Sequence, residues 1–547
     1  MKQTKLWLTT IVMLLGSITA SAHDFIVDGI YYGITSSTTV AVTYRGNYSD
    51  SYNNEYSGAV TIPSTVTYNS KTYSVTSIGS SAFYGCSSLT AITIPEGVTS
   101  IGSSAFSGCS SLYKVINYSN LSLSTGSSNY GYVAYYAKLI IKGSELTTIG
   151  DFQFCTSNGV HYLVNYIGKE TSITLPNDYN GANYDIRTCA FYGCSSLTSI
   201  TIPASVTSIG GSAFENCSSL TAINIPEGVK SIGSSAFYGC SSLTAITIPE
   251  GVKSIGNYAF DNCTALKKVI FEDGSETLSL GYNYYYSSST GQGLFYDCPL
   301  ESVYLGRNLS YSSGSSYGYS PFYNKDALVH VMIGREVTAI NNNAFKGCDN
   351  IHSLTINSGV LSIGSSAFST PDKVIWLTNT PPTGYANANG NINYVANNQY
   401  TSLSNVKVYP YLSSMFEVDG VKYVPVSPSE RTCHAIDCTY DSTAEIINVS
   451  ETTSFKGVAM KVTEVMPYTF YENNHIKEVA MSHLGNIGNY AFYNCDSIKT
   501  VNVSNQGNIG SQAFYNCDAI ESVTISNQGD IGEQAFYDCN GIRTTCR

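Results

Sequence analysis

The chain of 547 residues contains sixteen cysteines and seven histidines, the side chains that could bind a metal ion or take part in catalysis. The arrangement nearest to a metal site is Cys433-His434 followed by Cys438. A zinc site requires a second pair of ligands at a suitable spacing, and no such pair follows. The sequence therefore predicts a local disulfide or two unpaired thiols here, and no metal site.

Catalytic signatures are also missing from the sequence. The histidines form no H-E-x-x-H pair, and the chain has no G-x-S-x-G elbow, Walker loop or dinucleotide fingerprint. We therefore predict that the protein is not an enzyme, with no catalytic residues and no cofactor. The histidines are His23, His161, His330, His352, His434, His475 and His483.

Twelve cysteines share one place in a repeat. Stacked copies would lie about 4.8 Å apart with parallel Cβ vectors, which leaves the Cβ atoms too far apart for a disulfide. We expect a ladder of buried, reduced thiols. The remaining four, Cys189, Cys433, Cys438 and Cys546, are the better disulfide candidates. The ladder comprises Cys86, Cys109, Cys155, Cys194, Cys217, Cys240, Cys263, Cys298, Cys348, Cys495, Cys517 and Cys539.

Composition favours β structure and argues against nucleic-acid binding. Charged residues make up 12% of the chain, Tyr contributes 45 residues and Gly 47, and the formal net charge is −12. No Lys/Arg run stands out, so a polyanion is not the expected partner. Many β-branched, aromatic and small residues favour strands.

The N-terminus predicts export. Lys2 and Lys5 precede an apolar run over 6–18, and Ala20-Ser21-Ala22 forms an A-x-A cleavage site. This pattern is typical of a secretory signal peptide cleaved after Ala22. This run is too short for a comfortable membrane span, and no stretch of 18 apolar residues appears elsewhere. We expect an extracellular or cell-surface protein.

A repeat sets the expected architecture. The string A-F-x-x-C occurs ten times, at spacings of 23 and later 22 residues. Within a unit, Leu89, Ile92 and Ile94 follow the pattern of a strand with one buried face, and Pro95 ends it. We expect a short helical or 3₁₀ turn over 103–109, with Ala and Phe pointing inward. The prediction is a β-rich α/β solenoid of 22–23-residue repeats, each with a strand, a turn and a short helical turn. The ten Phe are Phe83, Phe106, Phe191, Phe214, Phe237, Phe260, Phe345, Phe492, Phe514 and Phe536, with a weaker copy at Phe154 among others.

The unit I-G-x-x-A-F-x-x-C-x-x-L-x-x-I-x-I-P resembles the BspA-like leucine-rich repeat of bacterial surface proteins. It departs from the commoner leucine-rich pattern, because its Cys stands three residues before the Leu. The resemblance covers about two thirds of the mature chain. It implies an exported adhesin or interaction protein, with fibronectin or fibrinogen as partners of some members. It carries over no catalytic residue.

The repeats divide the chain into segments. We predict a signal peptide over 1–22, a β cap over 23–77 and a first repeat array over 78–370 with an insertion over 118–186. A closing segment or linker over 371–415, a second β cap over 416–465 and a second array over 466–547 follow. The opening of the first cap, Phe25 to Tyr31, matches Phe416 to Tyr423. A third, looser relative lies over 159–186.

Candidate ligand contacts interrupt an otherwise small and hydroxylated strand face. They are Lys268, Ile270, Tyr304, His330 and Met332, in successive turns. An apolar and aromatic cluster within a polar face is typical of a binding hot spot, and ordinary repeat divergence is the alternative.

Tyrosines gather in the insertions, where they suit either contacts with sugars and proteins or packing against the strands beneath. We predict a surface adhesin for host matrix or cell-surface proteins. The alternative is a carbohydrate-binding surface protein of a glycan-utilisation system. The clusters are Tyr130, Tyr132, Tyr135 and Tyr136, then Tyr282, Tyr284, Tyr285 and Tyr286, then Tyr311, Tyr317 and Tyr319.

The C-terminal repeat stops within its unit. The next inward position falls on Thr545, before the chain ends at Arg547. The preceding strand, with Val523 and Ile525, would then offer an open edge that pairs with other chains. We expect this end to fray, to self-associate through the open edge or to reflect a chain cut short during gene evolution.

Overall fold

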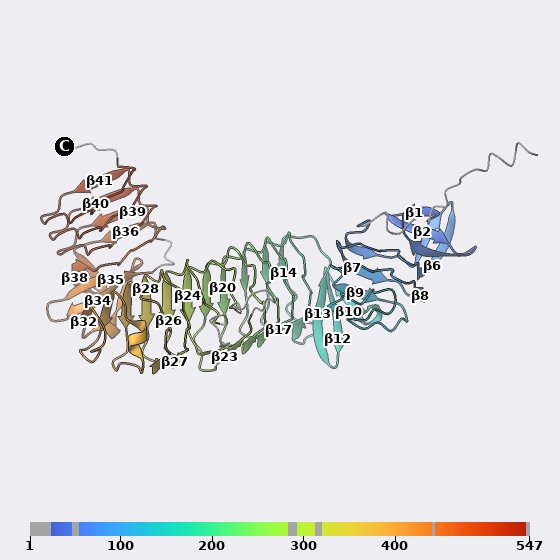
Figure 1. The fold of residues 1–547 in the computed structure, drawn as a ribbon, viewed down its shortest axis with the longest axis horizontal. Helices are drawn as coiled ribbons and strands as arrows, with labels where there is room; N and C mark the ends of the chain where they lie inside the picture. Colours follow the sequence, from blue (N-terminus) through green and yellow to red (C-terminus); the bar gives the residue numbers. More distant parts are fainter. Residues whose placement is uncertain (1–22, 46–53, 283–292, 312–319, 440–443, 543–547) are drawn as a thin grey trace, which may run out of the picture. The chain divides into compact units, whose positions relative to one another are not determined.

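The computed structural model describes residues 23–45, 54–282, 293–311, 320–439 and 444–542, and Figure 1 shows its fold. The chain divides into two compact units. The first comprises Met1–Lys169 and Tyr179–Tyr192, and the second comprises Glu170–Asp178 and Gly193–Arg547. The predicted signal peptide, Cys546 and Thr545 lie outside the described residues, as do Tyr284, Tyr285, Tyr286, Tyr317 and Tyr319.

The first unit is built from strands. Its N-terminal sheet has the order β1-β2-β3-β6-β5 and is followed by a parallel sheet β10-β9-β7-β4. A third group, β11-β12-β13-β15, joins antiparallel strands to one parallel partner. The bounds are β1 Phe25–Val27, β2 Ile30–Ile34, β3 Thr39–Thr43, β4 Gly58–Thr61, β5 Thr65–Tyr68, β6 Lys71–Ile78, β7 Leu89–Ile94, β8 Ser100–Ile101, β9 Lys114–Asn117, β10 Leu139–Lys142, β11 Thr147–Ile149, β12 Phe152–Ser157, β13 Val160–Tyr166 and β15 Tyr184–Ile186.

The second unit stacks repeat strands into long parallel sheets. The largest has the order β20-β22-β24-β26-β28-β30-β31-β32, and a later one has the order β36-β39-β40-β41. The bounds in these two sheets are β20 Ala245–Ile248, β22 Lys268–Phe271, β24 Ser302–Leu305, β26 His330–Ile333, β28 Ser353–Ile356, β30 Lys373–Trp376, β31 Ile392–Val395, β32 Val406–Val408, β36 Ile446–Val449, β39 Glu478–Met481, β40 Thr500–Val503 and β41 Ser522–Ile525.

Shorter strands complete this unit. They are β14 Ser172–Thr174, β16 Ser199–Thr201, β17 Val206–Ile209, β18 Ala222–Asn224, β19 Ser231–Ile232, β21 Ser254–Ile255, β23 Leu278–Leu280, β25 Leu309–Ser310, β27 Ala339–Ile340 and β29 Ser362–Ile363.

Two separate segments fold alike. The sheet β33-β34-β35-β38-β37 has the same strand order and the same parallel and antiparallel pairings as β1-β2-β3-β6-β5. We refer to residues 25–78 as the first β unit and to 416–465 as the second β unit. The strands of the second are β33 Phe416–Val418, β34 Val421–Ser427, β35 Thr432–Cys438, β37 Thr452–Phe455 and β38 Val458–Val465.

The repeat turn differs from the helical turn that we predicted. The described helical segments are three 3₁₀ turns outside the A-F-x-x-C motifs, Gly143–Glu145, Tyr385–Ala388 and Leu412–Ser414. Around Phe237, both Ser235 and Gly239 have positive φ, at 55° and 70°. A left-handed residue on each side of the Phe interrupts a right-handed helix, so the segment forms consecutive tight turns instead.

The repeated Phe residues form a buried stack. The ring of Phe237 lies 5.4 Å from that of Phe214 and 5.5 Å from that of Phe260, with interplanar angles of 3° and 6°. All three are fully buried. The repeat-rich, strand-dominated fold predicted from the sequence is confirmed.

Most of the repeated cysteines are buried thiols, as predicted. Cys240 Sγ donates to the carbonyl oxygen of Phe214 at 3.2 Å, and Cys263 does the same to Phe237. Each thiol therefore satisfies a backbone carbonyl of the preceding turn. Burial raises the pKa of Cys240 to about 12, so the thiol stays protonated and unreactive.

Lys325 occupies the Cys position of its repeat. Its buried ammonium group donates to the carbonyl oxygens of Phe295 and Tyr296. A ladder thiol can therefore be replaced by another donor that reaches the preceding turn.

The structure corrects two cysteine predictions. Cys155 belongs to the hairpin strand β12 rather than to the ladder, and Arg187 donates to its sulfur at 3.3 Å. Cys189 is buried, and Cys433 and Cys438 carry buried, unpaired thiols, which is the second of the two alternatives predicted for them, instead of a disulfide. Cys433 and Cys438 lie five residues apart on one strand, about 16 Å in extended chain, which is far beyond disulfide reach.

We expect thiol titration to separate the folded and unfolded proteins. The intact protein should react slowly because most described thiols are buried, and denaturation without reductant should expose nearly all of them. Ellman titration before and after denaturation measures this. If denaturation releases few new thiols, the cysteines are oxidised and the ladder argument fails.

Candidate functional site

The five predicted contact residues lie on three neighbouring strands. Pairing of β22, β24 and β26 places Lys268, Ser302 and His330 in one row and Ile270, Tyr304 and Met332 in the next. We call Lys268, Ile270, Tyr304, His330 and Met332 the strand-face cluster. All five side chains are partly exposed, while the alternating residues of each strand are buried in the core.

Tyr304 is held in place at the centre of this cluster. Its hydroxyl donates to Asp273 Oδ1 at 2.6 Å. Burial and this carboxylate raise the pKa of Tyr304, so the phenol remains neutral. The ring is therefore a fixed, uncharged surface suited to packing rather than to proton transfer.

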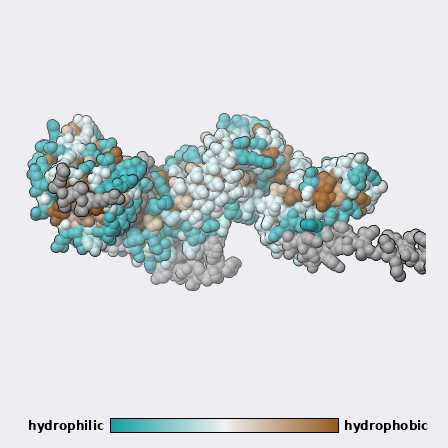
Figure 2. All heavy atoms as spheres, turned by 90° about the horizontal axis from the view of Figure 1, so that it is seen from above, coloured by the Kyte–Doolittle hydropathy of each residue, from teal (hydrophilic) through white to brown (hydrophobic). Residues whose placement is uncertain are grey.

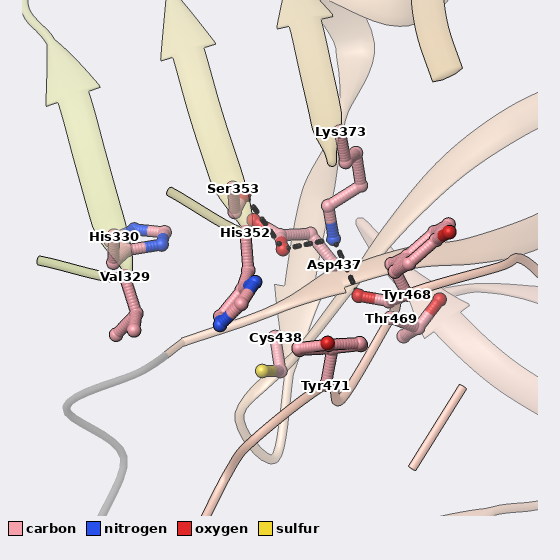
Figure 3. Close-up of a pocket in the computed structure, with 10 residues that line it drawn as sticks. All are labelled: Val329, His330, His352, Ser353, Lys373, Asp437, Cys438, Tyr468, Thr469 and Tyr471. Carbon is pink, nitrogen blue, oxygen red and sulfur yellow. Dashed lines mark hydrogen bonds and ion pairs between the residues drawn. The ribbon is translucent and has the colours of Figure 1, made fainter. Parts of the chain in front are cut away.

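The next strands of the same face are covered by the second β unit. Lys373 on β30 is completely buried, and its Nζ lies 2.6 Å from Asp437 Oδ1 on β35 (Figure 3). The same ammonium group donates to the carbonyl oxygens of Ile436 and Tyr468. Lys422 approaches the second carboxylate oxygen at 3.0 Å.

Asp437 remains ionised in this buried position. Burial alone would raise its pKa, but Lys373, Lys422 and His330 outweigh burial and hold the pKa well below its ordinary value. Apolar packing accompanies the charge pair, because Ile375 shares a buried cluster with Val424 and Ile436.

His352 bridges two carboxylates beside this pair. Nδ1 lies 2.6 Å from Asp372 and Nε2 lies 2.8 Å from Glu472, and the imidazole packs 4.1 Å from the ring of Tyr471. A cavity of about 20 Å³ separates His352 from Lys373 and Asp437, enough for one water molecule. This arrangement joins the repeat strands to the second β unit and to the segment that directly follows it.

We expect His352 to make stability pH-dependent. Burial lowers its pKa, but hydrogen bonds to Asp372 and Glu472 outweigh burial, so the pKa lies above its ordinary value. A raised folded-state pKa contributes stability that is complete below about pH 6.5 and is lost as the pH rises through the raised value.

Denaturant unfolding of the wild-type protein and His352→Gln across pH 5 to 9 measures this contribution. The stability difference between them should be largest at pH 5 to 6 and shrink towards pH 9. A difference that is constant with pH would contradict the charged bridge.

Sequence reasoning missed Lys373, Asp437, His352 and Glu472. Lysine, aspartate, glutamate and histidine side chains are mostly exposed in folded proteins, so none of these four positions is marked as buried by its own segment. The one available signal is that Lys373 is followed by Val374 and Trp376, whose alternation favours a strand.

An exposed tyrosine group lies in the first unit. Tyr132 and Tyr135 pack edge-to-face at 5.6 Å, and Tyr135 and Tyr136 do so at 4.9 Å. With Tyr130, these side chains are 37–46% exposed. Their exposure leaves aromatic surface available for a ligand.

Three further features bear on function. Within the described ranges, no group of three or more His, Cys, Asp or Glu is placed to hold a metal ion. No helix among the described residues is long and apolar enough to cross a membrane. On the face seen in Figure 2, hydrophobic residues form small separate patches among hydrophilic and neutral ones.

Several solved structures are similar to this chain. A leucine-rich repeat protein from Bacteroides ovatus is 21% identical over 95% of this chain and 93% of its own, with a TM-score of 0.27. A leucine rich cell surface protein from Faecalibacterium prausnitzii is 21% identical over 73% of this chain and 93% of its own, with a TM-score of 0.25. A leucine-rich repeat protein from Bacteroides capillosus is 31% identical over 23% of this chain and 96% of its own, with a TM-score of 0.21.

Comparison with curated proteins found no match. The family profile described as a BspA type leucine rich repeat region, with six copies, matches residues 59–169, 160–291, 283–380 and 448–544. These ranges cover more than half of the chain and include the stacked Phe and Cys positions described above. The chain belongs to the BspA-type leucine-rich repeat family.

Proposed function

We propose that this protein is an exported, non-enzymatic scaffold that binds host extracellular-matrix or cell-surface proteins. The strand-face cluster carries this proposal, because it sets aliphatic and aromatic side chains on a rigid parallel sheet while leaving them partly exposed. Membership of a repeat-scaffold family supports it. Fibronectin and fibrinogen enter as partners only through family resemblance.

The proposed organisation is two repeat arrays, each started by a β unit. The shared strand order of the first and second β units supports this division. A β unit closes the end of a stack whose terminal repeat would otherwise expose its core.

Replacing Tyr304 and Met332 together with Ser should weaken binding to a protein partner by about tenfold or more, because central aromatic and aliphatic contacts dominate interface energies. The measurement is binding of wild-type and variant proteins to immobilised fibronectin, fibrinogen and other matrix proteins. Tyr296→Ser is the matched control, since Tyr296 is an exposed tyrosine outside the cluster. Unchanged affinity of the double variant would move the site elsewhere.

A carbohydrate-binding surface protein is the second candidate. The exposed tyrosine group at Tyr130, Tyr132, Tyr135 and Tyr136 favours it, since aromatic rings pack against sugars. A glycan array compared with the matrix-protein panel discriminates the two. Glycan binding that is lost in Tyr135→Ala and unaffected by the strand-face variant would favour this second function.

A further inference from the structure

The strand sequence Lys-Val-Ile occurs three times in the two units. It forms Lys114-Val115-Ile116 in β9, Lys268-Val269-Ile270 in β22 and Lys373-Val374-Ile375 in β30. In every copy the Val is fully buried. Strand alternation therefore sends the Lys and the Ile to the opposite face of the sheet.

In two of the three copies this outer face is covered. Lys114 and Ile116 are 3% and 8% exposed, and Lys373 and Ile375 are completely buried. Lys268 and Ile270 remain partly exposed. The three strands carry the same Lys-Val-Ile sequence, so their different exposure depends on what packs against each strand.

The cover over β30 is strand β35 of the second β unit. Asp437 accepts from Lys373, and the preceding Ile436 shares the buried cluster of Ile375.

The cover over β9 is strand β13. Lys114 Nζ donates to Asn165 Oδ1 at 2.6 Å, and the preceding Val164 shares a buried cluster with Ile116. An aliphatic residue followed by an acceptor side chain therefore meets Lys-x-Ile in both places.

Strands β13 and β35 hold the same position in their sheets. Each pairs antiparallel with the preceding strand and parallel with a later one. The parallel register ends at Leu163↔Ile186 in β13 and at Ala435↔Val465 in β35. The pairs Val164-Asn165 and Ile436-Asp437 follow at the same place, so one docking arrangement is used twice.

In the exposed copy at Lys268 and in the covered copy at Lys373, a tyrosine stands beside the Ile on the neighbouring strand. Ile375 is in register with Tyr394 on the next strand, and Ile270 is in register with Tyr304. Tyr394 is fully buried in the docked interface, whereas Tyr304 is partly exposed. Lys268, Ile270 and Tyr304 therefore correspond to the Lys, Ile and Tyr around Lys373 that a docked β-strand covers.

We infer that Lys268, Ile270 and Tyr304 form a docking site for a β-strand of a different protein, one that carries an aliphatic residue followed by Asp or Asn. The inference rests on the proposed scaffold function and specifies the partner's chemistry. A second copy of this chain fits poorly. The two aliphatic–Asx pairs that stand at this docking position, Val164-Asn165 and Ile436-Asp437, already pack against its own strands, and the first β unit has Thr43-Tyr44 at the equivalent place.

Selection of displayed hairpins on the immobilised full-length protein tests this inference. The probe is a library of disulfide-closed β-hairpin peptides with two adjacent randomised positions on one strand. We expect hairpins with an aliphatic residue followed by Asp or Asn to be enriched about tenfold or more, the ratio expected for a charge-assisted hydrogen bond. Lys268→Glu and the milder Lys268→Gln should remove the enrichment.

Lys253→Glu is the control with the same charge change. Lys253 lies outside this face, 61% exposed and paired with Glu276 at 3.0 Å, so its variant should retain the enrichment. No preference for the aliphatic–Asx pair, or a preference that survives both Lys268 variants, would overturn the inference. A matrix protein that binds the wild-type protein and Lys268→Gln equally would overturn it while leaving the scaffold function standing. If the wild-type protein selects these hairpins but binds no matrix protein, only the proposed host-binding function would be overturned.

Discussion

Phe237→Ala should lower the free energy of unfolding by ~3–5 kcal/mol, the usual loss when a buried Phe is truncated. Phe237 is completely buried, with parallel rings on both sides at 5.4 and 5.5 Å. Its removal leaves a cavity that the two neighbouring turns cannot close, since each turn is held by backbone hydrogen bonds to the next.

Equilibrium denaturant unfolding measures this loss. Tyr296→Ala is the matched control, because it truncates a 46% exposed aromatic residue in the same unit and should cost less than about 1 kcal/mol. A loss below about 1 kcal/mol for Phe237→Ala would show that its ring is not part of a packed stack.

Lys373→Ala should cost ~3–5 kcal/mol, because it leaves the Asp437 carboxylate buried without its closest cation. The side chains of Lys373 and Asp437 are 1% and 3% exposed, so water cannot replace the lost partner. Lys422 compensates only in part, since it contacts the other carboxylate oxygen.

The double variant Lys373→Met with Asp437→Leu distinguishes burial of charge from loss of packing. It should recover part of the lost stability, because apolar groups of similar size often replace a buried ion pair at little cost, while Lys422 loses its carboxylate partner. Denaturant unfolding of both variants gives the comparison. A double variant as unstable as Lys373→Ala would contradict this explanation, as would a single variant that loses less than about 1 kcal/mol.

The second β unit determines which part of the outer strand face stays exposed. The second β unit buries the outer face at Ser353 and Lys373, whereas the strand-face cluster stays partly exposed. The part of the outer strand face that a ligand can reach is therefore the part that the second β unit does not cover.

The sequence by itself determined the repeat, the buried Phe and Cys columns and the strand that follows each of them. These depend on contacts between neighbouring turns, and a spacing of 22 or 23 residues brings equivalent side chains together in every turn. The strand-face cluster could be predicted for the same reason, because strand alternation assigns Ile270 and Tyr304 to one face.

The tertiary structure alone decided the turn geometry and the buried charges. Gly239 hints at a left-handed residue, but Ser235 does not, so the pair of positive φ values that replaces the helical turn had no sequence signal. Lys373 and Asp437 lie 64 residues apart and in different sheets. Each is typical of an exposed position in its own segment, and only the meeting of the two faces removes water from both, because burial depends on what packs against a strand as well as on the strand's own pattern.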